Sequence, residues 1–145
     1  MRHTPAWWRD TSGAALWALL LGVTALWVHG SGLQDVGTIA GFLTSFGRLT
    51  GLVASDLLLI QVLLIARIPP LERAFGQDRV VRMHRLIGLT SINLLVAHIV
   101  LNTWGYAGGR LLAWPATLWD LTWNYPGMLL AVAGAACLGM VVVTS

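Results

Sequence analysis

Lysine is absent from the sequence, and acidic residues are scarce. The nine basic residues are all arginine, and aspartate and glutamate together number six, which gives a formal net charge of +3. Charged residues make up only 10% of the chain, hydrophobic residues make up 57%, and the mean hydropathy is +0.73. A chain this poor in charge cannot cover the surface of a soluble domain, so its surroundings must be lipid. The arginines are not interleaved with aromatic residues along a basic groove, which argues against nucleic acid as a partner.

Cysteine occurs once, at Cys137, between Ala136 and Leu138 in an apolar block. A single cysteine can form neither a disulfide framework nor a thiolate metal site, so we interpret Cys137 as a packing residue. No internal repeat or low-complexity tract is evident in the sequence. The length therefore predicts one compact unit over residues 1–145.

The apolar residues form long blocks rather than the alternating ten-residue segments of an outer-membrane barrel. Each block is close to the ~20 residues that a helix needs to cross ~30 Å of hydrocarbon. Pro69 and Pro70 end one block, and Pro126 suits the first turn of another. The predicted fold is all-α, a transmembrane helical bundle. It has about four membrane-spanning helices, at residues 14–29, 48–68, 83–104 and 126–144.

The first apolar block has features of both a signal peptide and a membrane helix. It follows a short basic segment with Arg2 and Arg9, as a signal peptide does. However, it contains Trp17 and Trp27, and no clear A-x-A cleavage site follows it. We therefore favour a retained helix.

The arginines predict the orientation of the bundle. Seven of them fall on one side of it, and only Arg48 and Arg110 fall on the other. The positive-inside rule then places the amino terminus in the cytoplasm, in a multi-pass protein of the inner (plasma) membrane. The seven are Arg2, Arg9, Arg67, Arg73, Arg79, Arg82 and Arg85.

Residues 105–125 lie outside the membrane in this orientation, and three tryptophans fall among them. Trp114, Trp119 and Trp123 are consistent with a short helix in the headgroup region or with a plain aromatic belt, of which the belt is favoured. At the other end of the chain, residues 141–145 bring no basic anchor to the cytoplasmic side. This predicts that the natural polypeptide continues and that the sequence is an amino-terminal part of it.

Two histidines lie on the third predicted span. His84 and His98 are fourteen residues apart, which corresponds to a rise of about 21 Å and a rotation within ~40° of four full turns. They therefore share one face of the helix, at opposite depths. Between them the same stripe passes through Gly88, Ser91 and Leu95. Gly88 and Ser91 are small enough to admit a flat, bulky group against the helix.

An ionisable side chain within a membrane is costly and is by default a functional candidate. Neutral imidazole is a good axial ligand for haem iron. A single membrane histidine is more often a packing residue bonded to a backbone carbonyl, but two on one face beside small residues favour haem ligation. At about 21 Å the two histidines cannot bind one iron. Each could supply one axial ligand to a different haem b, with a second helix carrying the opposing pair.

Arginines accompany these histidines at both ends of the spans. Arg48 is expected at the outer end of the second span, Arg67 at its inner end, and Arg85 beside His84. Each is placed to pair with a haem propionate, and the alternative is anchoring by snorkelling. We favour the functional interpretation for Arg48, whereas anchoring is at least as well supported for Arg67. The remaining polar residues in the spans are expected to bond helix to helix: Asp56, Gln61 and Asn93.

Several short motifs share a known pattern. They are the segments 47–51 (GRLTG), 66–69 (ARIP), 71–76 (LERAFG), 83–85 (MHR) and 97–98 (AH). Together they resemble the ferric-reductase-type transmembrane domain, a group that includes bacterial flavocytochrome oxidoreductases, ferric reductases and NADPH oxidases. The resemblance covers roughly Phe46 to the end of the chain. The histidine spacing is its most specific element, and the arginine and glycine motifs are weaker.

The resemblance implies a six-helix core that holds two b-type haems. Such a core passes electrons singly from a cytoplasmic FAD domain, itself reduced by NAD(P)H, to an acceptor on the opposite side. By this resemblance His84 would bind the inner haem and His98 the outer one, with Arg48 near the outer haem. The later helix with the second histidine pair and the flavin domain are not in this sequence. The resemblance therefore implies missing carboxyl-terminal helices and a flavin domain, or a partner subunit, and an inactive fragment without them.

Two other functions are compatible with the sequence. One is a dihaem cytochrome b subunit of another membrane complex. The other is a non-enzymatic assembly factor or transporter fragment whose histidines only join helices, although no inverted repeat or broken helix supports a transporter. We interpret the chain as the membrane electron-transfer part of a ferric-reductase-like oxidoreductase. The sequence leaves the electron donor, the acceptor and the oligomeric state open.

Overall fold

The structure is a computed structural model that describes residues 6–30, 32–66 and 75–144. The regular elements of these residues are all helical, and the bundle has the composition of a membrane protein. The prediction of an all-α transmembrane helical bundle is thus confirmed. Arg67, Arg73, Pro69 and Pro70 fall outside the described residues.

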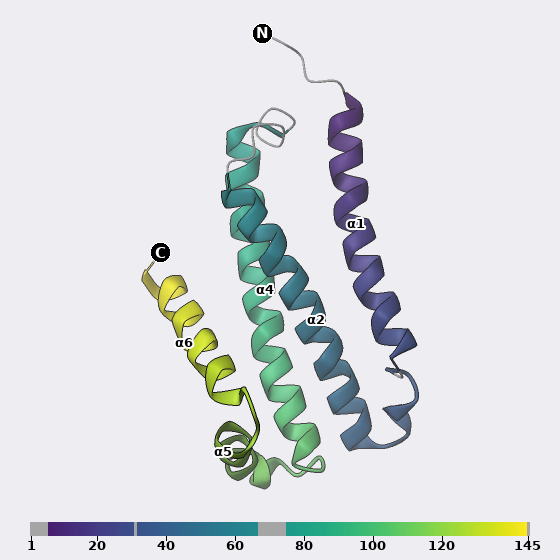
Figure 1. Ribbon diagram of the computed structural model, residues 1–145, viewed down its shortest axis with the longest axis vertical. Coiled ribbons are helices and arrows are strands. Elements are labelled where there is room, and N and C mark those ends of the chain that lie inside the picture. Colours follow the sequence, from purple (N-terminus) through teal and green to yellow (C-terminus); the bar gives the residue numbers. More distant parts are fainter. Residues whose placement is uncertain (1–5, 31, 67–74, 145) are drawn as a thin grey trace.

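Three long helices run in alternating directions along the bundle (Figure 1). The first is α1, Ala6–His29. A 3-10 turn, η1 (Asp35–Gly37), leads into α2, Ile39–Ile65, and α4 follows at Gln77–Tyr106. Helix α2 lies between α1 and α4 and packs most extensively against α4.

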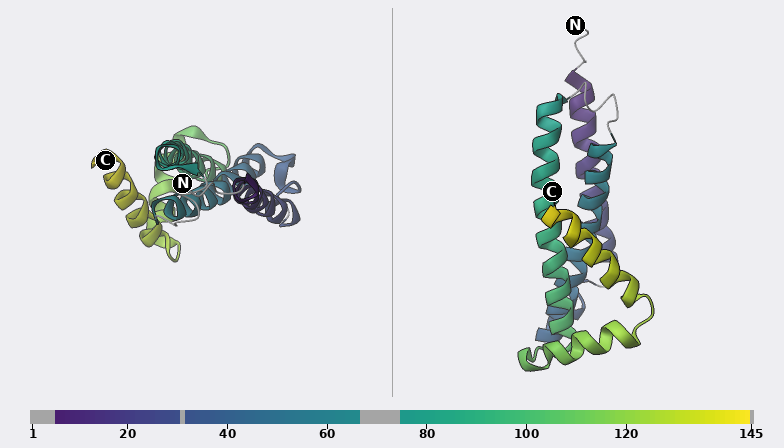
Figure 2. Two further views of the ribbon diagram at one scale, coloured as in Figure 1. Left: turned by 90° about the horizontal axis from the view of Figure 1, so that it is seen from above. Right: turned by 90° about the vertical axis from the view of Figure 1, so that its left-hand side faces the viewer.

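The carboxyl-terminal part turns across one end of the bundle. A 3-10 turn, η2 (Leu111–Ala113), continues into α5, Trp114–Asn124, and then into α6, Met128–Thr144. Figure 2 shows α5 crossing the foot of α4 and α6 turning back along the bundle. The bend between η2–α5 and α6 is 111°, and Gly127 at a φ of 81° lies within it. Glycine occupies such a left-handed conformation without the strain of a Cβ.

Helices α2 and α4 are long and apolar enough to cross a membrane. The bent pair of η2–α5 and α6 makes up to a third span, and α1 contains a shorter apolar stretch at Gly13–His29. The sequence predicted about four spans. Two of these predicted spans correspond to helices long enough to cross a membrane, and the first and the last predicted spans correspond to shorter apolar helices. The short helix at residues 114–124 is present, although the sequence favoured a plain aromatic belt.

Two helices begin earlier than the predicted spans. Helix α2 starts at Ile39 rather than near residue 48, with Thr38 as its N-cap, because the Thr38 Oγ1 accepts a hydrogen bond from the Gly41 N–H at 3.0 Å. Helix α4 starts at Gln77 rather than 83. The extra turns of α4 carry Gln77, Asp78 and Arg79, which lower the local hydropathy without preventing a helix. Those of α2 contain Ile39, Phe42 and Leu43 beside glycine, threonine and serine.

Glycines allow α2 and α4 to approach closely. A Cβ added at Gly47 would lie 2.9 Å from the Asn102 Cγ, and one added at Gly88 would lie 2.8 Å from the Gln61 Nε2. A Cβ at Gly105 would overlap Thr44. Membrane helices without a hydrophobic driving force between them associate through such close packing of small residues. The α2–α4 pair is therefore the rigid centre of the fold.

A hydrogen bond and an aromatic contact attach α1 to this pair. The Trp27 Nε1 donates to the Ser45 carbonyl at 2.9 Å, and the Ser45 hydroxyl donates to the Gly32 carbonyl. The Trp27 ring meets Phe46 edge-on, with centroids 6.0 Å apart. Near the opposite end, Ile60, Leu64 and Val80 form a small buried cluster.

We expect Gly105→Ala to destabilise the bundle. The added methyl group would overlap Thr44 and come within 3.0 Å of the Ala40 carbonyl, and overpacking of this kind costs about 1–3 kcal/mol. The measurement is unfolding of the detergent-solubilised protein by heat or by SDS titration. Gly134→Ala is the matched control, since nothing lies within 4 Å of its added Cβ. Equal unfolding midpoints for the two variants would contradict the close approach of α2 and α4.

Candidate functional site

His98 lies on the face of α4 that meets α2. A Cβ added at Gly51 would overlap the His98 imidazole, so the ring fits against α2 only because residue 51 is glycine. The His98 Nδ1 lies 2.8 Å from the Gly47 carbonyl oxygen. Gly47 and Gly51 are one helical turn apart on α2, and together they form the surface that receives the ring.

The Gly47 carbonyl determines the chemistry of the ring. A carbonyl oxygen can only accept a hydrogen bond, so its contact with His98 requires the proton to be on Nδ1. The neutral ring then carries its lone pair on Nε2. Metal-bound histidines commonly have this arrangement, in which one nitrogen donates to a carbonyl and the other binds the metal.

An open groove adjoins the His98 ring. Its volume is about 450 Å³. This is within the range of roughly 300–1,000 Å³ that is usual for ligand sites. Helices α2 and α4 both contribute to its lining, which consists of Arg48, Gly51, Leu52, Ser55, Leu95 and His98. The structure therefore places Arg48 and His98 at the same groove.

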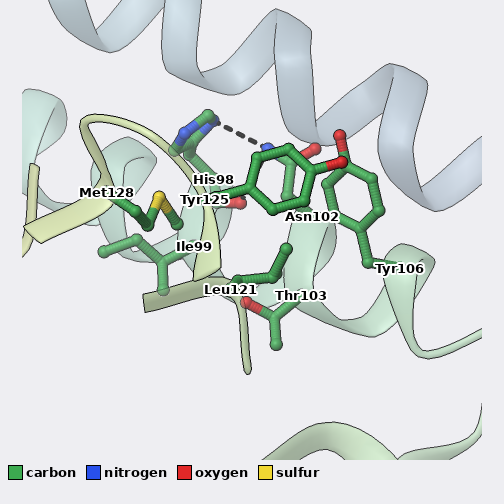
Figure 3. A pocket seen from close by; sticks show the side chains of 8 residues that line it. All are labelled: His98, Ile99, Asn102, Thr103, Tyr106, Leu121, Tyr125 and Met128. Atoms are coloured by element: carbon green, nitrogen blue, oxygen red, sulfur yellow. Dashed lines mark hydrogen bonds between the residues drawn. The ribbon is translucent and has the colours of Figure 1, made fainter. Parts of the chain in front are cut away.

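A smaller cavity of about 150 Å³ lies between His98 and the end of α4 that meets α5 (Figure 3). It is enclosed by α4, α5 and the start of α6, and the rings of Tyr106 and Tyr125 lie with their centroids 6.5 Å apart. The residues that line it are His98, Ile99, Asn102, Thr103, Tyr106, Leu121, Tyr125 and Met128. His98 thus borders two spaces, one open and one partly enclosed.

His84 lies toward the other end of the same helix. Helix α4 is uninterrupted from Gln77 to Tyr106, so the predicted rise of about 21 Å between the two histidines applies. The His84 Nδ1 is buried and has no hydrogen-bond partner among the described residues. A buried ring nitrogen without a hydrogen bond is costly. This end of α4 therefore has a polar group whose partner is not among the described residues.

Gly88 and Ser91 lie between the histidines, but they face α2. The Gln61 side chain fills the space beside Gly88, and the Ser91 side chain is fully buried, with its hydroxyl donating to the Gly88 carbonyl at 2.9 Å. The small residues therefore admit the neighbouring helix at this point. On this stripe, an open groove lies next to His98 and Leu95.

The arginines differ in their surroundings. Arg48 lies within α2 rather than at its head, because the helix begins at Ile39. Arg85 follows His84 on α4 and is exposed. Arg67 is outside the described residues, so its predicted role stays a prediction. Arg48 is thus the one of the three that the described structure places in a cavity with a histidine.

Within the described part of the chain, three polar residues do not form the expected helix-to-helix bonds. Asn93 donates to the Leu89 carbonyl of its own helix at 2.8 Å. The Asp56 Oδ2 and Gln61 Oε1 are buried without a hydrogen-bond partner in the described part of the chain. Within the same residues, no three side chains of His, Cys, Asp or Glu gather to hold a metal ion.

Sequence reasoning missed three contributors to the site. Gly51 makes room for the His98 ring, the Gly47 carbonyl orients it, and Asn102 contacts it. The spacing of Asn102, one turn after His98, was a signal for the last of these. The roles of the glycines depend on how α2 and α4 pair, which no spacing within one helix reveals.

These features define a polytopic membrane protein whose long helix α4 carries two histidines toward its opposite ends. A family model described as "Ferric reductase like transmembrane component" matches residues 50–145. The match covers more than half of the chain, so the protein belongs to this family. No curated protein and no solved structure matches the chain. The match begins at Thr50, so His84 and His98 lie inside it and Arg48 lies just before it.

Gly51→Ala tests the packing of the His98 ring. The added methyl group would overlap the imidazole and push its Nδ1 away from the Gly47 carbonyl. We expect the hydrogen-bonded Nδ1–H signal of His98 to be lost in ¹H–¹⁵N NMR spectra of the histidine side chains. Gly22→Ala, where nothing lies within 4 Å of the added Cβ, should leave that signal in place. An unshifted His98 signal in Gly51→Ala would disprove the contact.

Proposed function

We propose that the chain is the membrane electron-transfer part of a ferric-reductase-like oxidoreductase, and that it carries electrons through b-type haems. The family match supports a membrane component of this kind. The observation that carries the haem assignment is the His98 ring, whose Nδ1 lies 2.8 Å from the Gly47 carbonyl oxygen beside an open groove.

The residues of the groove suit a haem. His98 would offer its Nε2 lone pair as one axial ligand, and a bound haem would supply the one-electron iron couple. Leu52 and Leu95 provide apolar contact for a porphyrin face, and Arg48 provides a guanidinium for a propionate. Ligation by histidine and burial in an apolar groove are the means by which a protein sets a haem potential.

His84 would serve a second haem at the opposite depth. Its buried Nδ1, which has no hydrogen-bond partner among the described residues, supports a polar site there. Each histidine provides one ligand, so the opposing ligands belong to other helices of the complete protein or to a partner subunit. A flavin domain with FAD, reduced by NAD(P)H, is the electron source that this proposal requires on the cytoplasmic side.

Substitution of the histidines tests the proposal. In the full-length protein purified from membranes, we expect a Soret absorbance band, and we expect His84→Ala and His98→Ala each to lose one of two haems. His29→Ala is the control, because His29 is exposed at the end of α1 and should leave the band unchanged. Full absorbance in both His→Ala variants, or no pigment in the wild type, would instead favour a non-enzymatic membrane protein.

Arg48→Gln tests the propionate contact. Loss of a charge-assisted hydrogen bond costs about 1.5–3 kcal/mol, so haem retention should fall by roughly tenfold or more. The measurement is the rate of haem transfer from the purified protein to apomyoglobin. Arg110→Gln is the control, since Arg110 is exposed and its Nε lies 3.4 Å from the Ala107 carbonyl, away from the groove. Equal transfer rates for the two variants would assign Arg48 to anchoring.

A further inference from the structure

Asn102 follows His98 by one turn on α4 and contacts it twice. Its Nδ2 lies 3.1 Å from the His98 carbonyl oxygen and 3.0 Å from the His98 Nδ1. Figure 3 shows the second contact as a dashed line between the two side chains. Asn102 is therefore a side chain that approaches the Nδ1 of the ring, the nitrogen opposite Nε2.

The orientation of the Asn102 amide follows from its surroundings. The Nδ2 donates one hydrogen to the His98 carbonyl, and the Oδ1 lies toward Gly47, where an added Cβ would be 2.9 Å from it. The reversed amide would place two oxygen atoms against each other at the His98 carbonyl. The amide N–H end is thus held next to the His98 Nδ1.

Asn102 and Gly47 make opposite demands on the His98 Nδ1. This nitrogen cannot donate to the Gly47 carbonyl and accept from the Asn102 amide at the same time. The carbonyl favours the Nδ1–H tautomer, and the amide N–H opposes it. A strong hydrogen bond from Nδ1–H to an acceptor makes the imidazole a better donor to a metal. An N–H dipole 3.0 Å away weakens that bond.

We propose that Asn102 is a positioning residue that weakens the His98 Nδ1–H bond to Gly47 and thereby raises the midpoint potential of the haem that His98 binds. A weaker imidazole donor stabilises ferric iron less, which favours the reduced state. The effect on the potential rests on the proposed function, whereas the effect on the ring is a property of this chain alone. Neither the family match nor the histidine spacing assigns a role to Asn102.

Asn102→Leu removes the amide and preserves its branched shape. In the full-length protein in lipid nanodiscs, redox titration should give a lower midpoint potential for the haem that is lost in His98→Ala. The matched control is Asn93→Leu. Asn93 makes the same bond to the carbonyl four residues earlier, at 2.8 Å, and forms no hydrogen bond to a histidine among the described residues. The midpoint potential of the same haem in Asn93→Leu should equal that in the wild type.

A second readout does not require haem. In the haem-free full-length protein, ¹⁵N NMR of the His98 ring should show more Nδ1–H tautomer in Asn102→Leu than in the wild type or in Asn93→Leu. Asn102→Asp replaces the amide N–H by an acceptor oxygen and should shift the ring in the same direction. This variant keeps the test valid if the Leu variant misfolds.

The outcomes separate the two proposals. An unchanged tautomer, or an unchanged potential with haem bound, would overturn the role of Asn102 and leave the haem assignment in place. A wild-type protein that binds no haem would overturn the proposed function and the effect on the potential with it. The NMR comparison would still decide whether Asn102 acts on the ring.

Discussion

The close approach of α2 to α4 is the constraint on which the site depends. Glycine at positions 47 and 51 leaves no side chain between the helices, so a backbone carbonyl of α2 reaches the His98 ring on α4 at 2.8 Å. Any larger residue at these positions would separate the carbonyl from the ring. The close packing of the two helices thus sets the hydrogen-bond contact of the imidazole. The small residues that allow this packing also leave room for the groove beside His98.

The distribution of satisfied and unsatisfied polar atoms divides the bundle into two parts. Around His98 the ring nitrogen, the Asn102 amide and the Trp27 indole all have hydrogen-bond partners. Toward the other end, single atoms of Asp56, Gln61 and His84 are buried without partners among the described residues. Buried polar groups in hydrocarbon are costly unless paired. The end of the α2–α4 pair that carries His84 therefore still has polar capacity for additional groups, whereas the polar side chains at the His98 end contact one another.

Much of this architecture was predictable from the sequence, because its causes are local. Hydropathy identifies the long helices, and the spacing of His84 and His98 places them on one face of a continuous helix. The early start of α4 at Gln77 was not predictable from hydropathy, because its first turns contain glutamine, aspartate and arginine. The contacts of Gly51 and Gly88 were not predictable either, since they depend on the pairing of two helices. For the same reason, Gly88 and Ser91 were predicted to face a bulky group, and the structure places α2 against them.

The continuity of α4 has a mechanical consequence. Both histidines project from one unbroken rod of 30 residues, so the interval between them is set by covalent geometry and backbone hydrogen bonds rather than by loops. When a bilayer becomes thinner or thicker, a helix of fixed length responds by tilting. Changes in lipid composition should therefore alter the inclination of the two imidazoles relative to the membrane while their mutual separation stays constant.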